Sequence, residues 1–289
     1  MPELPVPAAR TGRRQVHDLP QAPDLIVVPA RYGSTRLPGK PLIPIAGRTL
    51  LQRVAAMARA AGQLAGNCEV IVATDDDRIA DHARSLDVEV ALTAADISSG
   101  SARACAAARQ RASRPRLVIN LQGDAPFIPP AVIAALIAAL RLGDAQVATP
   151  VFRLDWARLD RLRAHKTRAP FSGTTCLRAS DGRALWFSKT ILPAIRDEAE
   201  HRKAPFSPVF QHLGLYGYRL EALEWFASTP STPYETLEGL EQLRFLEAGM
   251  HITTVEVDPP LHALSGIDTA ADVALAEEAI ASFGDPYPA

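Results

Sequence analysis

Apolar residues between Asp24 and Gly143 follow two alternating patterns. Continuous apolar runs at 25–28 and 70–73, together with the mainly apolar segments 88–90 and 117–121, predict strands. The segments between the runs carry apolar residues on one face and predict helices. Strands that alternate with helices of this length predict a three-layer α/β domain with a mainly parallel sheet.

Residues that favour helix ends mark where these helices begin. Thr49 can cap a helix, a second helix runs from Asp76 onward, and Ser99 and Ser101 can start an alanine-rich one. Pro130 suits a first helical turn, and Gly143 suits the end of the same helix.

The second half of the chain is mixed. Residues 174–178 and 184–188 flank Asp181-Gly182, a strong signal for a β-hairpin. The pattern also predicts strands at 213–218 and 251–257, and helices at 236–248 and 269–281. We therefore expect one α/β domain over residues 23–289 with an inserted hairpin, rather than two independent domains.

Residues 1–22 differ from the rest and predict a disordered tail. No apolar segment follows the basic residues, so the tail does not resemble a secretory signal. A targeting or partner-binding role is the alternative. The tail contains Pro2, Pro5, Pro7, Pro20, Arg10, Arg13 and Arg14.

The composition excludes several classes of protein. Of the 289 residues, 47% are hydrophobic and 22% charged, which is typical of a soluble globular protein and not of a disordered one. The net charge of −1 gives no general reason to bind nucleic acid or a membrane, and no apolar run approaches the roughly 20 residues of a transmembrane helix. Cys68, Cys105 and Cys176 form no CxxC motif, which fits a reducing cytoplasm.

The loop after the first predicted strand, residues 29–41, carries candidate chemistry. It holds two glycines, two hydroxyls and three cations at the carboxyl end of a strand, where open α/β sheets bind ligands. Arg31, Arg36 and Lys40 can neutralise a polyphosphate, while the glycines let backbone N–H groups approach it. The alternative is a solvated basic loop. The loop matches neither the GxxxxGK[ST] nor the GxGxxG fingerprint.

The loop resembles the amino-terminal signature of the sugar-acid cytidylyltransferases, and most nearly that of the 3-deoxy-manno-octulosonate (Kdo) cytidylyltransferase family. Further segments agree in the same order, and together they cover roughly residues 24–283. They are Ala73-Thr74-Asp75-Asp76, Asn120-Leu121-Gln122-Gly123-Asp124, His212-Leu213-Gly214-Leu215-Tyr216-Gly217-Tyr218, Leu240-Glu241-Gln242-Leu243-Arg244 and Gly266-Ile267-Asp268-Thr269.

The resemblance implies a nucleotide-diphospho-sugar-transferase-like, Rossmann-like fold with a mixed sheet. It implies a nucleotide half over about 23–150 and an acceptor and dimerisation half over about 151–289. The expected reaction couples CTP to an acidic sugar and releases pyrophosphate, as in lipopolysaccharide precursor synthesis. The expected assembly is a cytoplasmic homodimer.

The resemblance also implies site residues. The nucleotide would contact Arg31, Ser34, Arg36, Lys40, Ser99, Gly100 and Gln122, and the catalytic residues would be Arg31, Lys40 and Asp124. Asp124 and Asp268 would hold Mg²⁺, an ion that prefers oxygen ligands. A strand-end cap is the alternative for Asp124, and a helix N-cap is the alternative for Asp268. Ser99 and Ser101 have the same helix-cap alternative.

The acceptor sugar would contact Lys189, His212, Tyr216, Glu241 and Gln242. A hydrogen-bonded strand histidine is the alternative for His212, and a core position is the alternative for Tyr216. The sequence departs from the family pattern at Ala102, Lys189 and Gln211, where an acid and two arginines are usual. Lysine lacks the bidentate fork with which arginine holds a carboxylate.

The departures leave the acceptor open. A modified octulosonate, a nonulosonic acid or a phosphonate is the first alternative, and a non-catalytic nucleotide-binding homologue is the second. No basic aromatic surface suggests a nucleic-acid partner.

Overall fold

The computed structural model of the protein describes residues 22–33, 36–260 and 266–288. Ten strands within these residues form one mixed sheet. Its first half is parallel, in the order β5 (Glu89–Leu92), β4 (Cys68–Thr74), β1 (Asp24–Pro29) and β6 (Leu117–Asn120). The second half continues with antiparallel neighbours, in the order β11 (Tyr216–Arg219), β7 (Val147–Asp155), β10 (Phe206–His212), β8 (Thr175–Arg178) and β9 (Ala184–Ser188). The last strand, β12 (Ile252–Glu256), pairs in parallel with β7.

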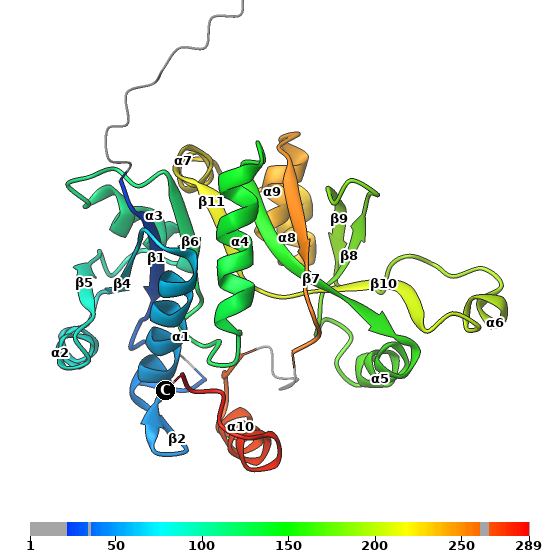
Figure 1. The fold of residues 1–289 in the computed structure, drawn as a ribbon, viewed down its shortest axis with the longest axis horizontal. Helices are drawn as coiled ribbons and strands as arrows, with labels where there is room; N and C mark the ends of the chain where they lie inside the picture. The colour runs from blue at the N-terminus through cyan, green and yellow to red at the C-terminus, as the bar shows by residue number, and fades with distance from the viewer. Residues whose placement is uncertain (1–21, 34–35, 261–265, 289) are drawn as a thin grey trace, which may run out of the picture.

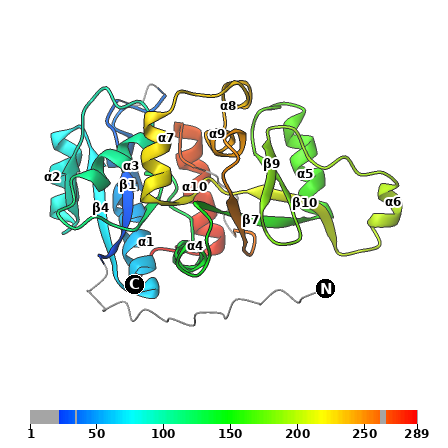
Figure 2. The same ribbon diagram turned by 90° about the horizontal axis from the view of Figure 1, so that it is seen from above.

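Helices cover both faces of this sheet (Figures 1 and 2). One face packs against α1 (Leu50–Ala65) and α4 (Pro130–Leu142), and the other against α3 (Gly100–Arg109) and α7 (Leu220–Ser228). Successive residues of β1 point to opposite layers, so Ile26 belongs to the first core and Val27 to the second. Burial on both faces explains the continuous apolar runs and confirms the predicted three-layer α/β class.

Side chains and prolines at the predicted positions begin the helices of the first half. Thr49 Oγ1 accepts a hydrogen bond from Gln52 N at 3.1 Å, and Asp76 caps α2 (Asp77–Ser85). Ser99 caps α3, and α4 begins with Pro130. These contacts satisfy backbone N–H groups that have no partner inside the helix.

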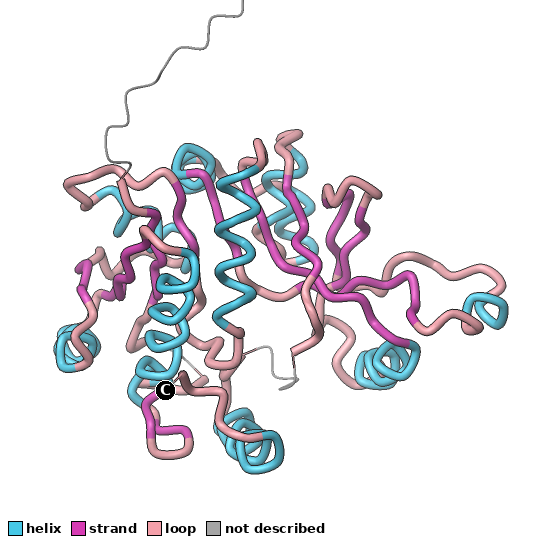
Figure 3. The backbone as a smooth tube through the Cα atoms, viewed as in Figure 1, coloured by secondary structure: helices cyan, strands magenta, loops and turns pink. Residues whose placement is uncertain are grey.

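The predicted hairpin forms β8 and β9, with Gly182 at a φ of 89° in its turn. Beyond the hairpin, α5 (Trp156–Lys166) and α6 (Glu198–His201) extend to one side of the sheet (Figure 3). The described residues contain no helix long and apolar enough to cross a bilayer. The predicted tail lies outside the described residues, except for Ala22.

Two predictions for the second half are wrong. The predicted helix over 236–248 is two helices, α8 (Pro233–Glu238) and α9 (Gln242–Glu247), because Gly239 between them has a left-handed φ of 63°. The predicted strand at 213–218 begins only at Tyr216. The pattern also did not identify β7, α5, β10 and α7. The closing helix is α10 (Ala270–Phe283), and η1 (Lys40–Leu42), β2 (Pro44–Ile45) and β3 (Arg48–Thr49) precede α1.

Gly217 lets β11 pack closely beneath α4. A Cβ atom there would lie 2.6 Å from Leu140 Cδ1 and 2.8 Å from Ile119 Cδ1. We expect Gly217→Ala to lower the free energy of unfolding by about 1–3 kcal/mol, because overpacking forces neighbouring side chains to move. Chemical denaturation measures this change. Gly214→Ala is the matched control, since a Cβ atom there has no neighbour within 4 Å, and an equal loss in both variants would contradict the packing argument.

Candidate active site

A polar cleft of about 260 Å³ opens at the carboxyl ends of β1 and β6. These strands are adjacent and parallel, so the loops that follow them meet at one edge of the sheet. The first turn of α3 and the segment before α10 complete the walls. The cleft is lined by Arg31, Arg36, Lys40, Ser99, Gly100, Arg103, Gln122, Asp124 and Asp268, among others. Ser34, predicted on the same loop, lies outside the described residues.

The Lys40 ammonium lies between two carboxylates. Its Nζ is 2.7 Å from Asp124 Oδ2 and 3.0 Å from Asp268 Oδ1. Arg36 adds a contact of 3.1 Å to the same Asp268 oxygen. Lys40 is only 14% exposed, so solvent screens this cluster less than it would an ion pair on the open surface. The two carboxylates therefore converge on a single positive charge.

The backbone before α10 brings Asp268 to Asp124. Ile267 is fully buried, and its N–H donates to the Asp124 carbonyl at 2.9 Å. Thr269 caps α10, and Asp272 completes the capping box. The N-cap interpretation of Asp268 is therefore wrong, and its carboxylate is directed to the cations instead.

Two glycines of the cleft lie at close approaches, and only at Gly123 is the neighbouring atom part of the backbone. A Cβ atom on Gly123 would lie 2.4 Å from the Pro29 carbonyl oxygen, where β1 ends. A Cβ atom on Gly100 would lie 2.9 Å from Gln122 Oε1. The Gln122 side chain therefore rests on the first turn of α3. Ser99 both caps that helix and lines the cleft, so its two interpretations are compatible.

The predicted acceptor residues form a second polar cluster beside the cleft rather than part of its lining. Tyr216 Oη donates to Gln242 Oε1 at 2.8 Å, and the His212 ring centroid lies 5.3 Å from that of Tyr216. Glu241 Oε2 accepts from Ser101 Oγ at 2.6 Å. Ser101 follows Gly100, so the first turn of α3 links the two ends of the site.

His212 is held in one tautomer. Thr149 Oγ1 donates to the Leu215 carbonyl at 2.7 Å, so it accepts from His212 Nε2 at 2.8 Å. Burial, with a smaller contribution from the positive charge of Lys189, lowers the pKa of His212 to about 3. The ring is therefore neutral at physiological pH.

Lys189 is fixed through its backbone. Its N–H donates to Glu238 Oε2 at 2.8 Å, and its carbonyl accepts from Lys166 Nζ at 2.6 Å. The Lys166 ammonium also binds the carbonyls of Ser172 and Gly173. Burial lowers the pKa of both lysines, and Lys189 lowers that of Lys166 further. Lys166 carries no motif in the sequence, and only the fold brings it to Lys189.

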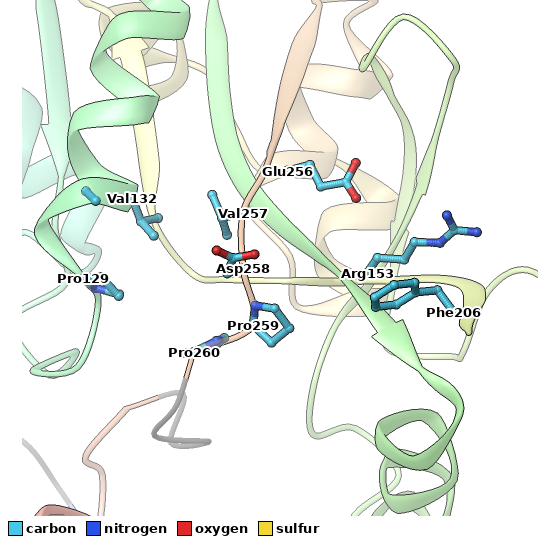
Figure 4. Close-up of a pocket in the computed structure, with 10 residues that line it drawn as sticks. Pro129, Val132, Arg153, Phe206, Glu256, Val257, Asp258, Pro259 and Pro260 are labelled. Atoms are coloured by element: carbon cyan, nitrogen blue, oxygen red, sulfur yellow. The ribbon is translucent and has the colours of Figure 1, made fainter. Parts of the chain in front are cut away.

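Two further cavities are lined by residues of both halves. The larger, about 850 Å³, is bordered by Val132, Arg153, Phe206 and Glu256, and none of the predicted site residues line it (Figure 4). The other, about 400 Å³, borders Gln211 and His212 and contains cations from α5. The departure at Gln211 thus faces this second cavity and not the nucleotide cleft.

The sheet and the cleft define a class of protein, an α/β protein with a polar ligand site at the carboxyl ends of parallel strands. The family model described as Cytidylyltransferase matches residues 25–252. The chain is 41% identical to the 3-deoxy-manno-octulosonate cytidylyltransferase of Maricaulis maris over 90% of its length and 98% of that protein, and 34% identical to that of Chlamydia pneumoniae over 90% and 95%. A solved CMP:2-keto-3-deoxy-manno-octonic acid synthetase in complex with CTP matches with a TM-score of 0.76 and 33% identity, over 90% of this chain and 99% of that one. The chain belongs to the 3-deoxy-manno-octulosonate cytidylyltransferase family.

The lowered pKa of His212 predicts a loss of stability in acid. The unfolded chain takes up a proton near pH 6.5 and the folded chain only near pH 3, so stability falls as the pH is lowered through this window. The upper bound of the effect is about 5 kcal/mol. Urea denaturation from pH 7 to pH 4 should show a steeper decline for the wild type than for His212→Gln. Equal slopes would contradict it.

Proposed function

We propose that the protein transfers the cytidylyl group of CTP to Kdo and releases pyrophosphate. The carrying observation is the convergence of Lys40, Asp124 and Asp268 in a polar cleft that glycine backbone lines. The printed names of the relatives and the CTP in the solved neighbour support the choice of nucleotide and acceptor.

In this proposal the cleft acts by positioning and charge neutralisation. The anomeric hydroxyl of the acceptor attacks the α-phosphorus in line and gives up its proton to water, and the bond from that phosphorus to pyrophosphate breaks. Arg31, Arg36 and Lys40 face the triphosphate and offset the charge that accumulates on the leaving group. Ser99, Gly100 and Gln122 face the cytosine and ribose. This reaction needs no covalent intermediate, and the described residues of the cleft show no obvious dedicated nucleophile.

The cluster at Lys40 fits a divalent cation, and we propose that Mg²⁺ is required. Asp124 and Asp268 already converge on one positive charge, and hard carboxylate oxygens are what Mg²⁺ prefers. Among the described residues no group of three or more acidic, histidine or cysteine side chains could form a full metal site. Two carboxylates plus phosphate oxygens and water is the usual set for Mg²⁺ at a nucleotide. When bound, the ion would neutralise charge on the triphosphate.

A related acid is the second candidate acceptor. It is favoured by the departures at Ala102, Lys189 and Gln211, none of which lines the nucleotide cleft. Pyrophosphate release should be measured with CTP against Kdo, modified octulosonates, nonulosonic acids and phosphonates. The compound with the highest kcat/KM is the acceptor. If no compound of the panel supports pyrophosphate release, the result favours a non-catalytic homologue. CTP should be preferred over UTP, because a site built for one base edge leaves polar groups unpaired with another.

We further propose a homodimer in the cytoplasm. The second half offers the surface for self-association, since α5 and α6 extend beyond the sheet and Phe206 is 46% exposed beside the 850 Å³ cavity. The cysteines are free thiols, as a reducing compartment requires. Light scattering after gel filtration gives the oligomeric state.

Asp124→Asn and Asp268→Asn should each reduce kcat at least 100-fold, because each removes one charged oxygen ligand of the cation. Steady-state pyrophosphate release at saturating Mg²⁺ tests both, with circular dichroism to verify folding. Asp144→Asn, on an exposed loop, is the matched control. Near-normal turnover in either variant would remove that aspartate from the proposed metal site.

Lys40→Ala and His212→Ala should affect different substrates. Removing Lys40 should cost about 100–1000-fold in kcat, because its charge counts most as pyrophosphate leaves. Removing His212 should raise the acceptor KM and leave the CTP KM nearly unchanged. Initial rates with each substrate varied in turn separate the two effects. If His212→Ala instead weakens CTP alone, the assignment of Glu241 and Gln242 to the acceptor also falls.

A further inference from the structure

Two buried amides at the junction of the two clusters each have one polar atom without a partner. Asn120, at the end of β6, is fully buried, and Gln242, at the start of α9, is 1% exposed. Among the described residues, Asn120 Oδ1 and Gln242 Nε2 find no hydrogen-bond partner. A buried polar atom left unpaired costs stability, so folding alone does not explain this arrangement.

The direction of the hydrogen bonds explains why these atoms are unpaired. Glu241 Oε2 can only accept when the carboxylate is ionised, so the proton of Ser101 Oγ must point to it across 2.6 Å. The lone pairs of Ser101 Oγ are then free to accept from Asn120 Nδ2 at 3.2 Å. This leaves Asn120 Oδ1 without a donor. The three residues form a one-way chain of donation from Asn120 through Ser101 to Glu241.

This chain of hydrogen bonds fixes one carboxylate oxygen of Glu241 and leaves the other oxygen available to accept a hydrogen bond. Glu241 is partly exposed, and its Oε1 makes no hydrogen bond within the described residues. Tyr216 imposes the same kind of order on the neighbouring residue. Burial raises the pKa of Tyr216 well above its ordinary value, so its hydroxyl stays protonated and donates to Gln242 Oε1.

We propose that Ser101 and Asn120 are positioning residues for Glu241, which they orient so that its free oxygen accepts a hydroxyl of the acceptor. This inference rests on the proposed function, because it assumes that Glu241 faces the acceptor. Ser101 follows Ser99 and Gly100, which line the nucleotide cleft, so one helical turn orders both ends of the site.

Ser101→Ala removes the donor to Glu241 and should raise the acceptor KM roughly tenfold to a hundredfold, the usual effect of losing a hydrogen bond to a charged group. The CTP KM should stay within about twofold. Ser101→Thr keeps the hydroxyl and should restore the acceptor KM. Ser207→Ala is the matched control, since this serine is also fully buried but donates to the Leu154 carbonyl. Should Ser101→Ala not fold, Ser101→Cys replaces it as a variant of similar size with a weak donor.

A double-mutant cycle tests whether Asn120 acts on Glu241 through Ser101. Asn120→Leu should raise the acceptor KM in the wild-type background and add nothing in the Ser101→Ala background, because Asn120 acts only through Ser101. A purely structural role would make the two effects additive. An active wild type whose acceptor KM is unchanged in Ser101→Ala overturns the inference alone. A wild type inactive with every acidic acceptor would instead refute the proposed function.

Discussion

The ion cluster of Lys40, Asp124 and Asp268 is the interaction on which the arrangement of the site depends. Two carboxylates brought together in a partly buried cleft repel each other, and the ammonium between them offsets that repulsion. Lys40 and Asp268 are separated by 228 positions in the sequence, so the cluster joins the beginning of the domain to its end. The hydrogen bond from Ile267 to the Asp124 carbonyl holds the same two segments together through the backbone.

The first half of the fold was predictable because its signals are local. Strands buried on both faces have continuous apolar runs in the sequence, and helix caps such as Thr49 and Ser99 mark where their helices begin. In the second half the decisive features depend on partners far away in the sequence. The strand β7 carries Pro150, which usually argues against a central strand, yet it pairs with β10, β11 and β12.

The candidate site divides in the same way. The residues predicted to contact the nucleotide stand in short motifs at the ends of predicted strands, and the structure gathers all of those it describes into one cleft. The resemblance to the family could name the residues predicted to contact the acceptor, but it could not give their arrangement in space. The hydrogen bond from Ser101 to Glu241 spans 140 positions, and the hydrogen bond from Lys166 to the Lys189 carbonyl has no sequence signature. The sequence allowed either Asp268 or Thr269 to cap α10, and the structure shows that Thr269 is the cap.

The departures from the family pattern acquire a physical meaning from this division. Under the proposed function, a change in the polar cleft would disturb charges that the reaction needs with every acceptor, whereas Gln211 and Lys189 lie outside the cleft. Lysine at position 189 offers a point charge where arginine would offer a fork, and the neighbouring ammonium of Lys166 already binds backbone carbonyls. Under the proposed assignment of these residues to the acceptor, a carboxylate there would meet less directional positive charge. Selectivity would then rest more heavily on neutral donors and on oriented groups such as Gln242 and Glu241.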